Sequence, residues 1–238
     1  GIPPDSNMWV TYSMNKEDIW VAKIPVPVKS IVEEDVCEVF NEMKQGEELL
    51  HWNIHSPLWA PVKTEKLPDG TKALSLSDKD RYEYAKAERV FPSSQKGTVE
   101  FTFIPAQNNR GVFHIELHDE KGTAALRLVF DSLGNCSIKD GYRYSGVFNY
   151  KPGEVYNIII SFDSKTQFYK VNVNGEDKKQ AMFFAPVKSL QRIVFRTGEP
   201  RRYPDPESPA EHTEDMPLSG EPVEKAAYYI KNVKTTRE

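Results

Sequence analysis

Hydrophobic and polar residues alternate along most of the chain between residues 97 and 196. The clearest case is residues 112–118, which read Val-Phe-His-Ile-Glu-Leu-His. Because successive side chains of a strand point to opposite faces, this pattern predicts a strand with one apolar and one polar face. The polar face carries histidine and glutamate, where a strand that simply faces solvent more often carries Thr, Ser and Lys. We therefore look for function first on this polar face.

The same alternation recurs in residues 98–103, 124–130 and 155–162, and shorter runs at 193–197 and 228–233 complete the set. Clusters of Asp, Asn, Ser and Gly separate these runs and supply turn chemistry. A strand about every ten residues, with no helix between strands, is typical of a sandwich of two antiparallel sheets. The sequence therefore predicts an all-β protein.

Two segments precede this sandwich, which is expected to span residues 71–238. In residues 1–30, the aromatic and β-branched runs 9–14 and 19–24 are joined by a polar turn, which predicts an N-terminal β-hairpin extension. A lone hairpin is marginally stable in water, so this one must pack on something. Within the sandwich segment, residues 198–224 hold six prolines and form either a structured excursion or a mobile flap.

The intervening segment, residues 31–70, is predicted to be a linker with a short helix and an aromatic loop. Apolar residues recur at helical spacing in residues 36–43. In the loop that follows, Trp52 and Trp59 are expected to anchor the chain on the sandwich, because their neighbours are too apolar to leave exposed. The alternative for such a loop is a platform on which a sugar ring stacks.

Composition removes several classes of function. At 238 residues and 39% hydrophobic content the chain can bury a substantial core. Its 31 basic and 35 acidic residues give a formal charge of −4, so we expect no nucleic-acid partner, and no apolar run is long enough for a membrane span. Cys37 and Cys136 could form one disulfide, but two lone thiols in a chain of this size are expected to be separate.

Four stretches of residues 72–234 together resemble the concanavalin A-like lectin/glucanase jelly roll, whose superfamily includes laminin G-like modules. They are Gly97-Thr98-Val99-Glu100-Phe101; Phe130-Asp131 with Gly134; residues 156–163 with Tyr169-Lys170-Val171-Asn172-Val173-Asn174-Gly175; and Tyr229-Ile230-Lys231-Asn232-Val233. The resemblance implies a two-sheet jelly-roll sandwich.

The predicted hairpin in residues 1–30 resembles the last strands of a sialidase-like (BNR) β-propeller, as found in secreted bacterial proteins that join such a propeller to a C-terminal jelly roll. The Asp-box pattern of that propeller family is matched nowhere in the chain. The resemblance therefore implies an accessory module of a carbohydrate-degrading protein in the periplasm or outside the cell, with a propeller domain of the same protein as its partner.

With the phase set by the apolar positions, one polar sheet face is expected to collect many charged and amide side chains. They are Glu100, Thr102, His114, Glu116, His118, Arg127, Asn157, Ser161, Lys170, Asn172, Arg192 and Arg196. Such side chains can meet the paired hydroxyls of a sugar, while an aromatic ring stacks on its apolar face. The plainer interpretation is a solvated face in which Glu116 and Arg127 form an ordinary cross-strand ion pair.

The leading hypothesis is a noncatalytic carbohydrate-binding or accessory module that holds a glycan or polysaccharide on this face. Tyr142 and Tyr144 lie in a Gly-flanked stretch at a sandwich edge, where either could stack on a sugar. The candidate ligand-binding residues are His114, Glu116, Arg127, Tyr142, Tyr144 and Arg196.

Two other functions stay open. A glycoside hydrolase could use Glu100 and Glu116, and a polysaccharide lyase could use His114 with Arg127 and a tyrosine. The strand that contains Glu116 lacks the alternating carboxylate triad of the glucanases of this superfamily. The third possibility is a purely structural domain that braces a propeller.

The resemblance also implies a possible structural calcium near the paired chain ends. Calcium prefers oxygen ligands, and Asp78 and Asp80 could supply carboxylates there. Two acids in a polar turn are also common without any metal.

Overall fold

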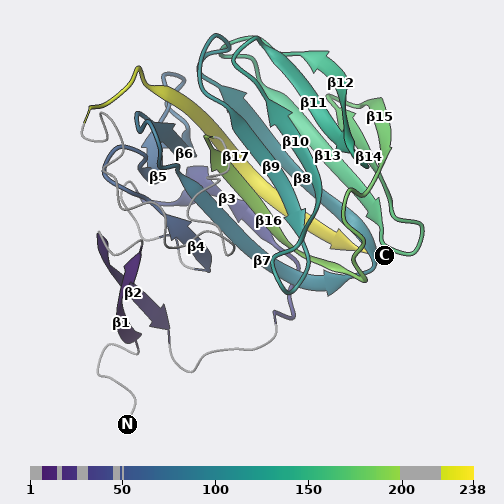
Figure 1. The fold of residues 1–238 in the computed structure, drawn as a ribbon, viewed down its shortest axis with the longest axis horizontal. Helices are drawn as coiled ribbons and strands as arrows, with labels where there is room; N and C mark the ends of the chain where they lie inside the picture. The colour runs from purple at the N-terminus through teal and green to yellow at the C-terminus, as the bar shows by residue number, and fades with distance from the viewer. Residues whose placement is uncertain (1–6, 15–17, 26–31, 45–48, 50, 199–220) are drawn as a thin grey trace, which may run out of the picture. The chain divides into compact units, whose positions relative to one another are not determined.

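The computed structural model describes residues 7–14, 18–25, 32–44, 49, 51–198 and 221–238, and these form two units (Figure 1). One unit contains a hairpin, in which β1 (Asn7–Met14) pairs antiparallel with β2 (Asp18–Pro25). The other contains strands β3 to β17. Most of the proline-rich segment 198–224 lies outside the described residues.

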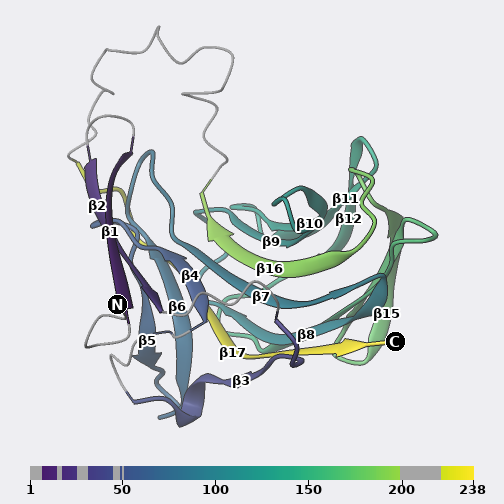
Figure 2. The same ribbon diagram turned by 90° about the horizontal axis from the view of Figure 1, so that it is seen from below.

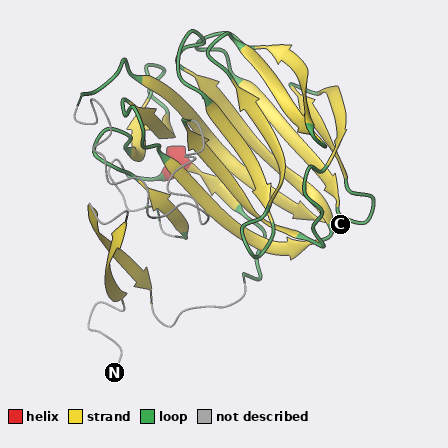
Figure 3. Ribbon diagram, in the orientation of Figure 1, coloured by secondary structure: helices red, strands yellow, loops and turns green. Residues whose placement is uncertain are grey.

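The all-β prediction is confirmed, because the larger unit consists of two antiparallel sheets that face each other (Figures 1 and 3). The seven-stranded sheet has the order β12 (Arg143–Asn149), β11 (Asn135–Asp140), β10 (Ala124–Phe130), β9 (Phe113–His118), β16 (Leu190–Thr197), β7 (Lys86–Ser94) and β4 (Trp52–His55).

The eight-stranded sheet has the order β15 (Glu176–Met182), β14 (Phe168–Val173), β13 (Tyr156–Asp163), β8 (Lys96–Pro105), β17 (Ala226–Arg237), β6 (Lys72–Asp78) and β5 (Val62–Lys66). The short strand β3 (Cys37–Val39) also pairs with β17. Strands that are neighbours in space are often far apart in sequence, as a jelly roll requires.

Aromatic rings from both sheets fill the space between them. Phe103 of β8 lies 5.3 Å from the ring of Phe113 in β9 and 4.4 Å from the ring of Phe130 in β10, measured between ring centroids. Tyr228 of β17 adds a ring 4.5 Å from that of Phe113. All four side chains are fully buried, so this cluster joins the sheets through close contact of rings.

Residues 36–43 do not form the α-helix that their spacing suggests. Cys37–Val39 pairs with β17 as β3, and only the single 3₁₀ turn η1 (Phe40–Glu42) follows. Phe40 is fully buried, which explains the apolar spacing without a helix. Residues 52–55 and 62–66 form β4 and β5 at the edges of the two sheets.

The aromatic loop meets the sandwich as expected at one position and not at another. Trp52 is buried, with its ring 5.7 Å from that of Phe40 and 6.3 Å from that of Phe195. Leu58, by contrast, is 82% exposed. Not every apolar residue of this segment therefore packs on the core.

The two cysteines are unpaired, as expected. Cys37 is exposed on β3, whereas Cys136 is buried on β11 of the other sheet. Burial raises the pKa of the Cys136 thiol, which leaves it in the unreactive protonated form.

Within the described residues, no helix has the length and apolar character needed to cross a membrane.

Replacing Phe103 by Ala should lower the free energy of unfolding by about 3–5 kcal/mol, because it opens a cavity among rings from both sheets. Leu133, which is 80% exposed, offers a control in which Leu133→Ala should cost less than about 0.5 kcal/mol. Urea unfolding measures both. Equal midpoints for the two variants would show that the ring cluster does not hold the sheets together.

Candidate functional site

The polar residues expected on one continuous face divide between the outer faces of two different sheets. The seven-stranded sheet carries His114, Glu116, His118, Arg127, Arg192 and Arg196, and the eight-stranded sheet carries Glu100, Thr102, Asn157, Ser161, Lys170 and Asn172. The single-face prediction is therefore wrong. Alternation decides on which side of its own sheet a residue lies, but it cannot say to which sheet the strand belongs.

The seven-stranded sheet curves, with its concave side turned away from the eight-stranded sheet (Figure 2). The register aligns outward side chains of neighbouring strands in rows. Glu116 lies opposite Arg127 on β10, and His114 lies opposite Arg196 on β16. We call this surface the concave face, and among its polar and aromatic residues are His55, Tyr84, Lys86, Glu88, His114, Glu116, His118, Arg127, Lys139, Tyr144, Arg192 and Arg196.

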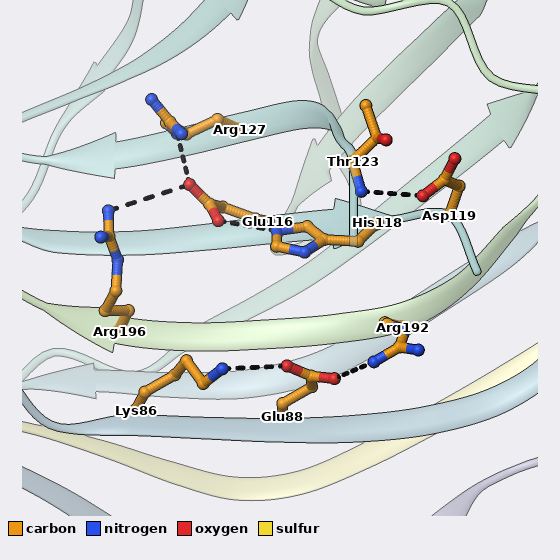
Figure 4. Close-up of polar contacts among 9 residues, drawn as sticks. All are labelled: Lys86, Glu88, Glu116, His118, Asp119, Thr123, Arg127, Arg192 and Arg196. Carbon is orange, nitrogen blue, oxygen red and sulfur yellow. Dashed lines mark hydrogen bonds and ion pairs between the residues drawn. The ribbon is translucent and has the colours of Figure 1, made fainter. Parts of the chain in front are cut away.

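Glu116 is the centre of the concave face (Figure 4). Its Oε1 accepts a hydrogen bond of 2.5 Å from Arg127 Nε and lies 4.0 Å from Arg196 Nη2, while its Oε2 lies 2.7 Å from His118 Nε2. Burial alone would raise the pKa of Glu116, but the hydrogen bond from His118 and the two guanidinium charges outweigh it and lower the pKa to about 2. The ion pair that the plainer interpretation expected is thus present.

A second carboxylate, Glu88 of β7, is held in the same way (Figure 4). Lys86 Nζ lies 3.1 Å from its Oε2, and Arg192 Nη1 lies 2.5 Å from its Oε1. Burial opposes ionisation, but these two cations lower the pKa of Glu88 below its ordinary value. Both carboxylates of the face are therefore ionised at neutral pH.

His114 is only 2% exposed, and the backbone of Gly198 lies close enough to its ring to favour the protonated imidazole. Burial, together with the charge of Arg196, lowers the pKa of His114 to about 3. The imidazole is therefore neutral at physiological pH. A ligand lying on the surface would not reach it directly.

Aromatic rings flank the charged rows on both sides. Tyr144 of β12 is 53% exposed, and the Lys139 ammonium lies 4.6 Å from its ring centroid. Burial lowers the pKa of Arg127, but Glu116 and the hydroxyl of Tyr144 outweigh this effect and raise it. On the other side, Arg196 Cζ lies 5.4 Å from the ring centroid of Tyr84. Tyr142 lies in the turn between β11 and β12 and is 97% exposed.

The alternation of apolar and polar residues did not predict that Tyr84, Lys86 and Glu88 belong to the site. Tyr84 lies just before β7, and its ring centroid is 4.9 Å from that of His55 on β4. Neither segment shows the strict alternation that drew attention to residues 112–118. Only the pairing of β7 with both β16 and β4 brings these residues onto the concave face.

The charge of the concave face is opposite in sign to that of the whole chain. Among the described strands of this sheet, five cationic side chains face outward against the two carboxylates Glu88 and Glu116. The cations are Lys86, Arg127, Lys139, Arg192 and Arg196. The arrangement favours an anionic group above the face.

The two carboxylates considered for glycoside hydrolysis do not meet. Glu100 belongs to β8 of the eight-stranded sheet, whereas Glu116 belongs to β9 of the other sheet. They project from opposite sides of the sandwich, so they cannot flank one glycosidic bond.

Asp78 and Asp80 use their oxygens within the chain. Asp78 Oδ1 accepts the Asp80 N–H at 2.9 Å, and Asp80 Oδ1 accepts the N–H groups of Tyr82 and Glu83 at 2.9 and 2.8 Å. Burial raises the pKa of Asp78 to about 6. The described residues contain no group of three His, Cys, Asp or Glu side chains that could hold a metal. The two residues alone do not fit the six to eight oxygens that calcium takes. Calcium stays a prediction from the resemblance.

Replacing His114 by Leu should change how stability depends on pH. In the wild type, the unfolded chain binds a proton at His114 below pH 6.5, whereas the folded protein does so only near pH 3. The folded wild type therefore loses stability at His114 as the pH falls from 6.5 towards 3. Between pH 6.5 and 5 the variant should gain about 2 kcal/mol relative to the wild type.

Urea unfolding of both proteins at several pH values measures this difference. The raised pKa of Asp78 acts in the opposite direction, adding stability as the pH falls from about 6, but it is common to both proteins and cancels. Parallel pH curves for the two proteins would contradict the assignment of a neutral buried His114.

Comparison with known proteins identifies the family of this chain. A family model described as "Sialidase-like, CBM domain" matches residues 52–212. Among curated proteins, none matches the sequence significantly. Among solved structures, a chain named "Sialidase" is 39% identical with a TM-score of 0.91, and the match covers 100% of this chain and 21% of that one. The chain therefore spans about a fifth of the length of that sialidase.

More distant structures share the fold alone. Apo Crh5 transglycosylase is 14% identical with a TM-score of 0.58, and the match covers 88% of this chain and 86% of that one. The Bacillus licheniformis β-glucanase is 13% identical with a TM-score of 0.54, covering 87% and 99%. Since the family model covers more than half of the chain, the protein belongs to the sialidase-like carbohydrate-binding module family.

Proposed function

We propose that this chain is a noncatalytic carbohydrate-binding module that holds a glycan on its concave face. The proposal rests on the surroundings of Arg127. Its Nε is fixed by the buried carboxylate of Glu116, and the exposed ring of Tyr144 lies beside it. A fixed guanidinium next to an exposed ring offers the hydrogen bonds and the stacking surface that a sugar needs.

The charge of the face makes an acidic glycan the preferred ligand. The strands of the face carry five cations against two carboxylates that are already paired, and Glu83 beside His55 adds a third carboxylate, so a carboxylate on the sugar would still meet an excess of positive charge. 3′-Sialyllactose and lactose form a suitable pair of probes, because they differ only by one carboxylate-bearing sugar.

The protonation of the carboxylates supports a noncatalytic role. A glycoside hydrolase needs one carboxylic acid that still holds its proton near neutral pH. Glu116 has its pKa lowered to about 2, and that of Glu88 is also lowered. Neither can supply the proton to a leaving group.

The hairpin supports a further part of the proposal, a place within a longer secreted protein. Trp9, Ile19 and Val21 lie on one face of the hairpin, opposite Lys23, Ser13 and Thr11 respectively, and are 59%, 84% and 57% exposed. An isolated two-stranded hairpin with large exposed apolar side chains needs a partner surface to be stable. We infer that a preceding domain of the same protein, a propeller by resemblance, supplies that surface in the periplasm or outside the cell.

Tyr144→Ala should weaken binding of 3′-sialyllactose about tenfold or more, because the stacking surface beside Arg127 is lost. Tyr142→Ala removes a more exposed ring from the adjacent turn and should change the affinity less than about twofold. Calorimetric titration measures both, and lactose should bind more weakly than 3′-sialyllactose to the wild type. If Tyr144→Ala binds 3′-sialyllactose as tightly as the wild type does, the concave face is not the binding site.

Arg127 itself is a poorer test, because it stabilises the fold as well as the face. Its removal leaves the Glu116 carboxylate buried with less compensation, which should cost about 3 kcal/mol of stability. Loss of binding by Arg127→Ala is informative only if the variant remains folded at the temperature of the titration.

The hairpin proposal predicts a difference in amide hydrogen exchange between this chain and the longer protein. The paired amides of β1 and β2 should exchange at least about tenfold more slowly in the longer protein, where the apolar face is covered. Val21→Asp should abolish that protection, and the exposed control Leu133→Asp should not. Equal exchange in the two proteins would speak against a docked hairpin.

A further inference from the structure

Exposed apolar side chains gather at one edge of the sandwich, where β14 and β15 lie near the β11–β12 turn. Phe168 and Met182 are cross-strand partners and are 38% and 49% exposed. The amide of Gly141 in that turn lies 3.4 Å from the Met182 carbonyl oxygen, so Tyr142 belongs to the same edge. Exposed apolar surface of this kind commonly marks a binding site.

A shallow hollow of about 340 Å³ lies beside Phe168 on the outer face of the eight-stranded sheet. Its lining includes Ser161, Lys170 and Gln180, which form one row across β13, β14 and β15. The next row, Asp163, Phe168 and Met182, runs alongside it. Two adjacent rows on three strands cover about 10 by 7 Å, the size of one or two sugar rings.

The polar side chains in the row of Ser161, Lys170 and Gln180 are available to a ligand. Within the described part of the chain, no hydrogen bond or ion pair is found for the side chains of Ser161, Lys170 and Gln180. Asp163, in contrast, accepts the N–H of Lys165 at 2.8 Å, and Lys96 is paired with Glu238. The concave face differs, because its carboxylates are fully occupied by cations.

We propose that this hollow is a second glycan-binding site, in which Phe168 stacks on the ring of a neutral sugar. Ser161, Lys170 and Gln180 then donate to or accept from its hydroxyl groups. An aromatic platform beside a few free polar groups is the usual composition of a small-ligand site. The balance of Lys170 against Asp163 gives no excess charge, so a neutral sugar is favoured here, unlike on the concave face.

The two sites are separate because they lie on different sheets. The proposal rests on membership of a carbohydrate-binding family, and it does not require the concave face to bind.

The test is a backbone-amide NMR titration of the chain with lactose and with N,N′-diacetylchitobiose. At least one sugar should shift the amides of Ser161, Phe168, Lys170 and Gln180 with a dissociation constant below about 10 mM. Phe168→Ala should weaken this binding about tenfold, and Phe168→Tyr, which keeps the ring, should restore it. Leu133→Ala, another loss of an exposed apolar side chain, should leave it unchanged.

Tyr144→Ala separates this site from the concave face, because it should leave these shifts intact. The absence of shifts with both sugars would overturn the second site, and so would shifts that persist in Phe168→Ala. If Phe168→Ala instead converts a dimer into a monomer in sedimentation, the edge is a contact between copies of the chain and the proposal fails. Binding of 3′-sialyllactose at the concave face can succeed or fail independently of each result.

Discussion

The buried carboxylate of Glu116 determines how the concave face is built. An ionised carboxylate with little access to water must be surrounded by cations and hydrogen-bond donors, and here three strands supply them: His118 from β9, Arg127 from β10 and Arg196 from β16. The same contacts hold these side chains in fixed positions. A ligand that binds Arg127 therefore meets a guanidinium that has already lost its rotamer freedom, which lowers the entropic cost of binding.

The fold of this chain does not by itself determine which chemistry a protein performs. The Crh5 transglycosylase and the β-glucanase share the sandwich at 14% and 13% identity, which shows that the fold alone does not determine an activity. In this chain the carboxylates of the concave face are consumed by ion pairs. What remains accessible is an excess of cationic and aromatic groups, and the proposed glycan binding rests on these groups.

A sandwich also has two outer faces, and in this protein they differ in electrostatic character. The concave face is strongly cationic and its polar groups are bound to one another. The outer face of the eight-stranded sheet near Phe168 is close to neutral, and its polar groups are free. Two sites of different charge preference on one small module would let it contact a branched or extended glycan at both an acidic and a neutral residue.

The sequence by itself determined most of the strands between residues 97 and 196, because a period of two in hydrophobicity is a local property that the chain carries wherever the strand lies. It also identified His114, Glu116 and Arg127 as outward residues, and the pairing of Glu116 with Arg127. Tertiary structure decided the rest. Strand order placed Glu100 and Glu116 on different sheets, pairing with β17 turned residues 37–39 into a strand, and long-range pairing brought Tyr84 and Glu88 to the face. These outcomes depend on which strands become neighbours, and alternation along one strand contains no information about its neighbours.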